Sequence, residues 1–119
     1  MFVPSVYSQP VRHTPETEEL MPLPISLAHR LTKKLSEVRR GCENSPLLPD
    51  GKSQITIEYD ELNRPQRVDT VIISSQHRAE ADLADLRPYI IEQVIKTTVP
   101  EHLLDSKTRY LINPTGRFV

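Results

Sequence analysis

The segment Ile55-Thr56-Ile57-Glu58-Tyr59 alternates apolar with polar side chains, which is typical of a half-buried β-strand. A second run, Val68 to Ser75, is rich in valine, isoleucine and threonine and predicts another strand. Between the two runs, Asp60–Pro65 has the composition of a turn of about five residues. Together these segments predict an antiparallel hairpin.

An amphipathic helix precedes the hairpin. Apolar side chains recur there at spacings of four, four and three residues, at Leu27, Leu31, Leu35 and Val38. We predict a helix from about Leu23 to Arg40. Pro24 suits its first turn, and Gly41 follows its last periodic residue, where helices commonly end with a positive φ. The opposite face is basic and could meet phosphate, but we expect it to be merely solvated: His29, Arg30, Lys33, Lys34, Arg39 and Arg40.

A second helix is predicted after the hairpin. Asp82 offers an N-cap, and an apolar face follows at Leu83, Leu86, Ile90 and Val94. The helix should end near Val99-Pro100. Pro88 is awkward inside it, because proline lacks an N–H group and crowds the preceding turn, so the regular part could begin only at Arg87.

The remaining segments complete an α+β fold. Residues 41–51 form a loop by composition, Glu101–Leu104 a short helical turn and Thr108–Ile112 a third strand. The order α-β-β-α-β predicts a two-layer sandwich with the helices on one face of a small mixed or antiparallel sheet. Proline-rich residues 1–21 are expected to be an extended or poorly ordered lead-in, in which Phe2–Tyr7 could pair as an edge strand, so the domain proper is residues 22–119.

The second strand carries branched side chains on both of its sides. Simple alternation sets Val71 and Ile73 against Val68, Thr70 and Ile72. Two helices cannot easily cover both faces of the sheet. We therefore expect one face to pack against another domain or another copy of the chain, and a charge at Val71 or Ile73 to disrupt that contact.

Composition excludes several classes of function. The 119 residues include 15 Lys and Arg against 16 Asp and Glu, a net charge of −1, which argues against a general nucleic-acid binder. No segment approaches the roughly 20 apolar residues of a membrane span, and no signal-peptide pattern opens the chain, so we expect a cytoplasmic protein. The single Cys42 cannot close an intramolecular disulfide or supply a cysteine-rich zinc site.

Few residues suggest chemistry by themselves. The four histidines, His13, His29, His77 and His102, stand far apart and predict no metal site; surface or hydrogen-bonded core positions suit them better. No Gly-x-Ser-x-Gly motif is present. The run Asp50-Gly51-Lys52-Ser53 ends like a P-loop, but Pro46 stands where a P-loop has its first glycine and a strand follows instead of a helix. Lys52 could still hold a phosphate as a point charge, although the spacing alone favours an ordinary surface lysine.

A second cluster lies near the end of the sequence. The run Asn113-Pro114-Thr115-Gly116-Arg117-Phe118 predicts a tight turn after a strand, with a guanidinium and an aromatic ring side by side. Such a pair can grip a phosphorylated aromatic ligand. A purely structural turn explains the run as well.

Several motifs, taken together, resemble the central part of S-adenosylmethionine synthetase (methionine adenosyltransferase). They occur in the family's order and spacing over about residues 14–119. The matching runs are Glu19–Leu31, Pro49–Gln54, Val68–Val71, Ser75–His77, Val94–Lys96 and Ile112–Val119.

The resemblance implies a specific function. Enzymes of this family join ATP and methionine with the help of Mg²⁺ and K⁺, and they form homodimers or homotetramers with active sites between subunits. The ATP contacts that map onto this sequence are Asp50, Lys52, Arg117 and Phe118, and Lys52 is the one expected to act in catalysis by neutralising the departing polyphosphate. The resemblance implies that the metal ligands lie outside this chain.

The sequence also departs from the family's pattern. The histidine and aspartate of the family's N-terminal domain, its mobile Gly-Ala-Gly-Asp-Gln-Gly loop and its later triphosphate and metal ligands have no counterpart here. We therefore expect a central-domain fragment that contributes to ATP binding but is inactive alone. The alternatives are a non-catalytic module that pairs with an intact synthetase subunit, or a truncated product without a role of its own.

Overall fold

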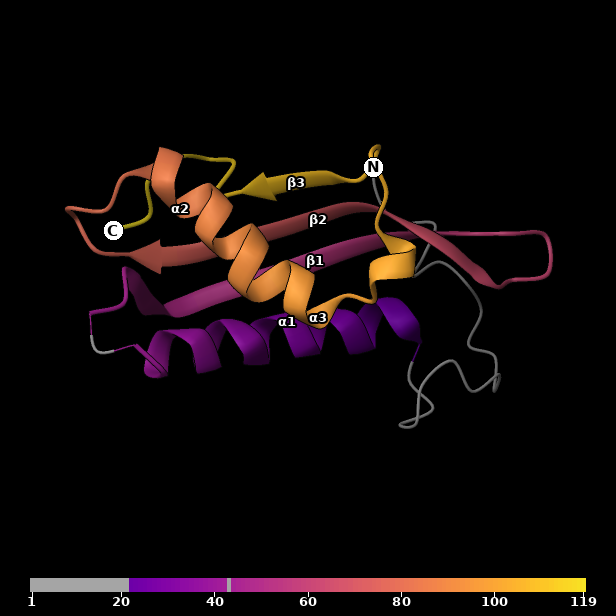
Figure 1. The fold of residues 1–119 in the computed structure, drawn as a ribbon, viewed down its shortest axis with the longest axis horizontal. Helices are drawn as coiled ribbons and strands as arrows, with labels where there is room; N and C mark the ends of the chain where they lie inside the picture. Colours follow the sequence, from indigo (N-terminus) through magenta and orange to yellow (C-terminus); the bar gives the residue numbers. More distant parts are fainter. Residues whose placement is uncertain (1–21, 43) are drawn as a thin grey trace.

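The computed structural model describes residues 22–42 and 44–119, and the expectations for residues 1–21 lie outside this part. The predicted α-β-β-α-β order is confirmed (Figure 1). Its elements are α1 (Leu23–Arg40), β1 (Leu47–Tyr59), β2 (Pro65–His77), α2 (Leu83–Ile90), the π-helical turn η1 (Ile91–Ile95), α3 (Lys96–Thr98), the 3-10 turn η2 (Glu101–Leu103) and β3 (Arg109–Ile112).

The three strands form one mixed sheet in the order β1-β2-β3. Strand β1 pairs with β2 in antiparallel fashion, and β2 pairs with β3 in parallel fashion. Apolar side chains of α1, the α2–η1 segment and the inner sides of the strands join in a single core cluster, and Figure 1 shows the two long helical segments packed on the sheet. This is the predicted two-layer α+β architecture.

Helix α1 has the predicted bounds and buries the predicted leucines. Leu27, Leu31 and Leu35 are all buried in the core. Ser53 of β1 also fastens the helix, since its hydroxyl donates to the carbonyl oxygen of Ala28 at 2.7 Å. The expected positive φ at Gly41 is wrong: its φ is −80°, and its N–H donates to the carbonyl of Glu37 as a further helical turn would.

Strand β1 begins much earlier than predicted. Residues 47–51 belong to the strand and not to a loop, because Leu47 pairs with His77 and Gly51 with Ser75. Between these two pairs, three residues of β1 (48–50) lie opposite the single residue Gln76 of β2, so the strand carries an irregularity at Pro49. Proline is tolerated because β1 is an edge strand.

A bulge in β2 changes which side chains share a face. Thr70 pairs with Thr56 and Val68 with Ile57, so Asp69 is the extra residue. Val68 therefore points to the same side as Val71 and Ile73, and all three are fully buried beneath the helices. The predicted opposition of Val68 to Val71 is wrong.

No helix within residues 22–42 and 44–119 covers the sheet's other face, which is made mostly of polar side chains. Thr70 and Ile72 of β2 pair with Arg109 and Leu111 of β3 on this outer face. Ile72 is half-buried and Leu111 is 38% exposed. The uncovered face is therefore not the one that bears Val71 and Ile73, and those two residues belong to the core.

The second helix begins at its predicted cap. The Asp82 side chain accepts a hydrogen bond from the N–H of Ala84 at 2.9 Å, and α2 starts at Leu83. Pro88 lies inside the helix without delaying its start to Arg87, so that expectation is wrong. The irregularity comes after the proline instead, as the π-helical turn Ile91–Ile95.

Candidate functional site at the carboxyl end of β2

The two predicted clusters flank the carboxyl end of strand β2. On one side, Gly51 and Lys52 of β1 pair with Ser75 and Ser74. On the other side, the backbone of Phe118 is hydrogen-bonded to His77. The C-terminus and the start of β1 accordingly lie at the same end of the sheet, near the arrowhead of β2 (Figure 1). The fold thus brings two segments that are far apart in the sequence to either side of one strand.

Asp50 and Lys52 are exposed, and Gly51 between them is not. Gly51 lies beneath α1, where an added Cβ would come within 2.8 Å of Leu35 Cδ2. Since side chains alternate along a strand, Lys52 projects to the outer face. Among the described residues, no ion pair or side-chain hydrogen bond engages Asp50 or Lys52, so both remain available to a ligand.

The lysine does not lie in a phosphate-binding loop. It stands within β1, and no helix follows it, so the nested amides and helix dipole of a P-loop are absent at this run. The expectation that this run leads into a strand, and not into the helix of a P-loop, is confirmed. Lys52 can act only as a mobile positive charge.

The turn after β3 is built as its sequence predicts. Asn113 adopts a positive φ of 46° and Gly116 one of 105°. The side-chain amide of Asn113 is buried and pairs with the backbone of Ser75, accepting from its N–H at 2.8 Å and donating to its C=O at 3.0 Å. The Asn113 side chain thus makes the two hydrogen bonds to β2 that the backbone of a further residue of β3 would make. The chain then continues past this point to residue 118.

Arg117 and Phe118 leave this turn in fixed directions. The Arg117 guanidinium donates to the carbonyl oxygen of Ala81 at 2.9 Å and also to that of Ala79. These are the contacts that the described residues make with it, and they leave the other three of its five N–H donors for an anion. The Phe118 ring belongs to a half-buried residue.

Sequence reasoning gave His77 and Arg78 no role in the site. His77 is fully buried, and both of its ring nitrogens are hydrogen-bonded. The side-chain Nε of Arg78 donates to the carbonyl oxygen of Ser45 at 2.8 Å, and the backbone N–H of Arg78 donates to the carbonyl oxygen of Pro46 at 2.9 Å. The expectation of a hydrogen-bonded core histidine is confirmed at His77. Its partners could not be read from spacing, because they lie far away in the sequence.

Comparison with known proteins decides the family. Residues 13–118 match the sequence model of "S-adenosylmethionine synthetase, central domain". The chain belongs to this family.

Similar synthases confirm the assignment. The chain is 60% identical over 104 residues to the S-adenosylmethionine synthase of Streptococcus equi subsp. zooepidemicus strain MGCS10565. It is 58% identical over 104 residues to that of Streptococcus suis strain 05ZYH33. Each alignment covers 87% of this chain and 26% of the relative, so the chain spans about a quarter of the length of these synthases.

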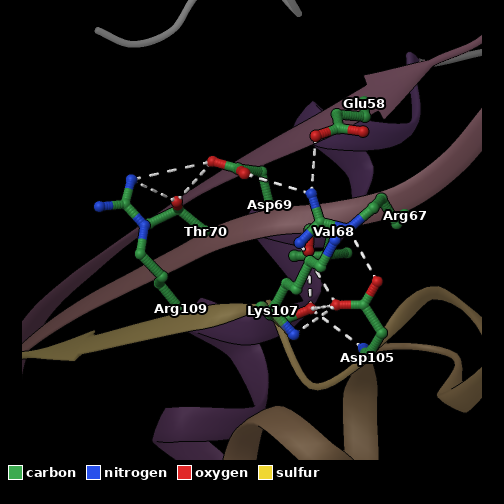
Figure 2. A network of polar contacts seen from close by, with 9 residues as sticks. Glu58, Arg67, Val68, Asp69, Thr70, Asp105, Lys107 and Arg109 are labelled. Atoms are coloured by element: carbon green, nitrogen blue, oxygen red, sulfur yellow. Dashed lines mark hydrogen bonds and ion pairs between the residues drawn. The ribbon is translucent and has the colours of Figure 1, made fainter.

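A second polar cluster of this synthetase central domain lies beside the turn between β1 and β2, where Glu58 pairs with Arg67. Figure 2 shows the cluster from close by. The Arg67 guanidinium forms ion pairs with Asp105 at 2.8 Å, Glu58 at 2.7 Å and Asp69 at 3.2 Å, and its side chain is only 18% exposed. The hydrogen bond from Arg67 lowers the pKa of Asp105 to about 2. The pKa of Asp69 is also lowered, chiefly by the hydrogen bond from the Thr70 hydroxyl.

We assign this cluster a structural role, because it links neighbouring segments of the sheet. It joins β1, β2 and the segment before β3, and the buried Thr108 hydroxyl adds a hydrogen bond to the Val68 carbonyl at 2.8 Å. The described residues hold no group of three or more histidine, cysteine or acidic side chains that could bind a metal ion. None of their helices is long and apolar enough to cross a membrane.

Proposed function

We propose that this chain supplies one wall of the ATP site of a methionine adenosyltransferase. The observation that carries the proposal is the position of two segments matched to the family, which flank the carboxyl end of β2 on its two sides. Lys52 lies on one side of that strand, and Arg117 and Phe118 lie on the other. The two segments lie on opposite sides of β2, so about two strand spacings of roughly 4.8 Å each separate them, a gap that an extended nucleoside triphosphate can span.

Each residue has a role that follows from its chemistry. Arg117 and Phe118 seat the adenosine, with the ring stacking and the guanidinium contacting oxygen atoms. Asp50 accepts hydrogen bonds from polar groups of the ligand. Lys52 places a positive charge beside the triphosphate, where negative charge accumulates as this group departs.

The proposed reaction needs little acid–base chemistry from these residues. The methionine sulfur donates an electron pair to C5′ of the ribose, a C–S bond forms, and the C5′–O bond breaks with its electrons going to the triphosphate. The triphosphate is then hydrolysed to pyrophosphate and phosphate. A neutral thioether has no proton to lose, so position and charge stabilisation supply the rate enhancement.

The Mg²⁺ and K⁺ of the proposed reaction have no matching ligand cluster among the described residues. We therefore assign no step to a metal held by this chain. Further residues of the site come from other parts of a complete synthase, and the chain alone should form no S-adenosylmethionine. We propose that it acts in the cytoplasm.

The outer sheet face is the proposed contact with a second subunit. It carries Ile72 and Leu111 among polar and charged side chains, and no helix of the described residues covers it. Lys52 lies on this same face, which favours a nucleotide site at a subunit boundary in a homodimer or homotetramer. The face also favours the second candidate function, a non-catalytic module that pairs with an intact synthetase subunit.

Calorimetric titration of the chain with ATP tests the proposed site. Lys52→Ala and Arg117→Ala should each weaken binding about tenfold, because each removes a charged contact. Lys33→Ala, on the exposed side of α1, is the matched control and should leave the affinity unchanged. Equal affinities in all three variants would refute the assignment.

Two further assays separate the candidate functions. Incubation with ATP, methionine, Mg²⁺ and K⁺ should yield no S-adenosylmethionine from the chain alone, and turnover above background would contradict this. Stable co-purification with a full-length synthase subunit, lost in Ile72→Asp, would favour the pairing module. Failure to co-purify would count against it.

A further inference from the structure

We propose that His77 is a positioning residue that holds Arg117 and Phe118 in place for the nucleotide. This inference rests on the proposed ATP site and extends it to a side chain that does not itself touch the ligand. His77 is the last residue of β2 and is completely buried, so its ring acts from within the protein.

The hydrogen bonds of the ring define its chemical form. Nε2 accepts from the Phe118 N–H at 3.1 Å, which requires a lone pair on that nitrogen. Nδ1 lies 3.0 Å from the Arg78 carbonyl oxygen, which can only accept, so Nδ1 carries the proton. The geometry therefore assigns one neutral tautomer, in which both polar atoms of a buried ring are satisfied.

The ring completes a short ladder between β2 and the C-terminal segment. The His77 N–H donates to the Phe118 carbonyl at 2.9 Å, and the ring accepts from the N–H of the same residue. His77 thus binds both the N–H and the carbonyl group of the Phe118 backbone. Its neighbour Arg117 is then directed at the carbonyls of Ala79 and Ala81 in the turn that follows β2.

Arg78, the residue after His77, also binds the segment that leads to Asp50 and Lys52, the other half of the proposed site. The Arg78 carbonyl binds the His77 ring, while the Arg78 side chain and N–H bind the carbonyls of Ser45 and Pro46. These residues lead directly into the strand that bears Asp50 and Lys52. His77 and Arg78 therefore join both halves of the site and set the distance between them.

Two isosteric variants test the role of Nε2. A glutamine amide can place its oxygen near the position of Nε2, whereas an asparagine amide reaches only the position of Nδ1. We expect His77→Gln to keep the bond from Phe118 and His77→Asn to lose it. Amide hydrogen exchange at Phe118 should be about tenfold faster in His77→Asn than in His77→Gln, a change typical of one hydrogen bond.

The affinity for ATP separates a positioning role of His77 from a role in folding alone, because a role in folding alone would leave the affinity of the folded variants unchanged. The ATP dissociation constant should rise about tenfold in His77→Asn and stay within about twofold of the unsubstituted chain in His77→Gln. Exchange at Val71 in the core reports folding and should be the same in both variants. Equal exchange at Phe118 in the two variants, or equal ATP affinity, would overturn the inference.

A measurement on the unsubstituted chain covers the case in which both variants fail to fold. Nitrogen NMR of the His77 ring should show a protonated Nδ1 and a coupling across the hydrogen bond from the Phe118 N–H to Nε2. A ring protonated at Nε2 would overturn the inference. If the chain shows these signals but binds no ATP, then the proposed function fails while the hydrogen bond that holds Phe118 stands.

Discussion

Gly51 lies within the run Asp50–Ser53, which the sequence marks as a candidate for ligand binding, but the glycine itself serves the packing of α1 on β1. It separates the exposed Asp50 and Lys52, and the sequence alone places it at the end of a loop predicted from composition over residues 41–51. In the structure its lack of a side chain lets α1 approach β1, because a Cβ would meet Leu35 at 2.8 Å and the Ser74 carbonyl oxygen at 3.2 Å. The glycine is required by the contact with the helix.

Gly51→Ala should therefore lower the free energy of unfolding by about 1–3 kcal/mol, the usual cost of overpacking a core. Urea unfolding measures the change. Gln54→Ala, at an exposed position of the same strand, should stay within about 0.5 kcal/mol. An alanine at residue 51 with unchanged stability would contradict the packing argument.

Asp105 gives a second prediction at this scale, for the dependence of stability on pH. Its pKa is about 2 in the folded chain and about 3.9 when unfolded, so its contribution is complete above about pH 4 and is lost as the pH falls through 2. Asp105→Asn should be less stable than the parent chain at neutral pH, with the difference shrinking between pH 4 and pH 2. Urea unfolding across this range tests it, with Glu101→Gln as a control that should change little at any pH.

At the scale of elements, the bulge at Asp69 decides which side chains of β2 face the core. Val71→Asp should unfold the domain, because it places an unpaired charge in a fully buried position. Ile72→Asp, one residue further along, should keep the fold because its side chain lies on the outer face. Circular dichroism separates the two outcomes, and a folded Val71→Asp variant would show that the assignment of faces is wrong.

Elements with a local signal were predictable, and those set by distant pairing were not. Helix α1 matched its predicted bounds because its leucine spacing and Pro24 are local features. The early start of β1 depends on pairing with residues 75–77, which its proline-containing sequence does not reveal. The bulge in β2 likewise follows from register with Ile57. Lys52, Arg117 and Phe118 stood out by residue type, and the resemblance matched them and Asp50 to ATP contacts. Their places beside β2 and the proposed role of His77 needed the fold.

At the scale of the whole molecule, the uncovered outer face predicts self-association. If two copies pair through it, sedimentation should show a dimer whose population rises with protein concentration. Leu111→Asp should shift the molecule to the monomer while leaving its thermal unfolding nearly unchanged, because the side chain is already 38% exposed in one copy. A monomer at every concentration would exclude this face as a self-contact.

The parallel pairing of β3 with β2 has a consequence for the order of folding. The β1–β2 hairpin closes a short loop and can form early, whereas β3 must wait for the intervening helical segment to cross over. In pulse-labelled refolding, Val71 should gain protection before Phe118, and simultaneous protection would contradict this order. During synthesis on the ribosome, the β1–β2 hairpin would accordingly form while residues 117 and 118 were still inside the exit tunnel, so the proposed ATP site would be the later part of the domain to assemble.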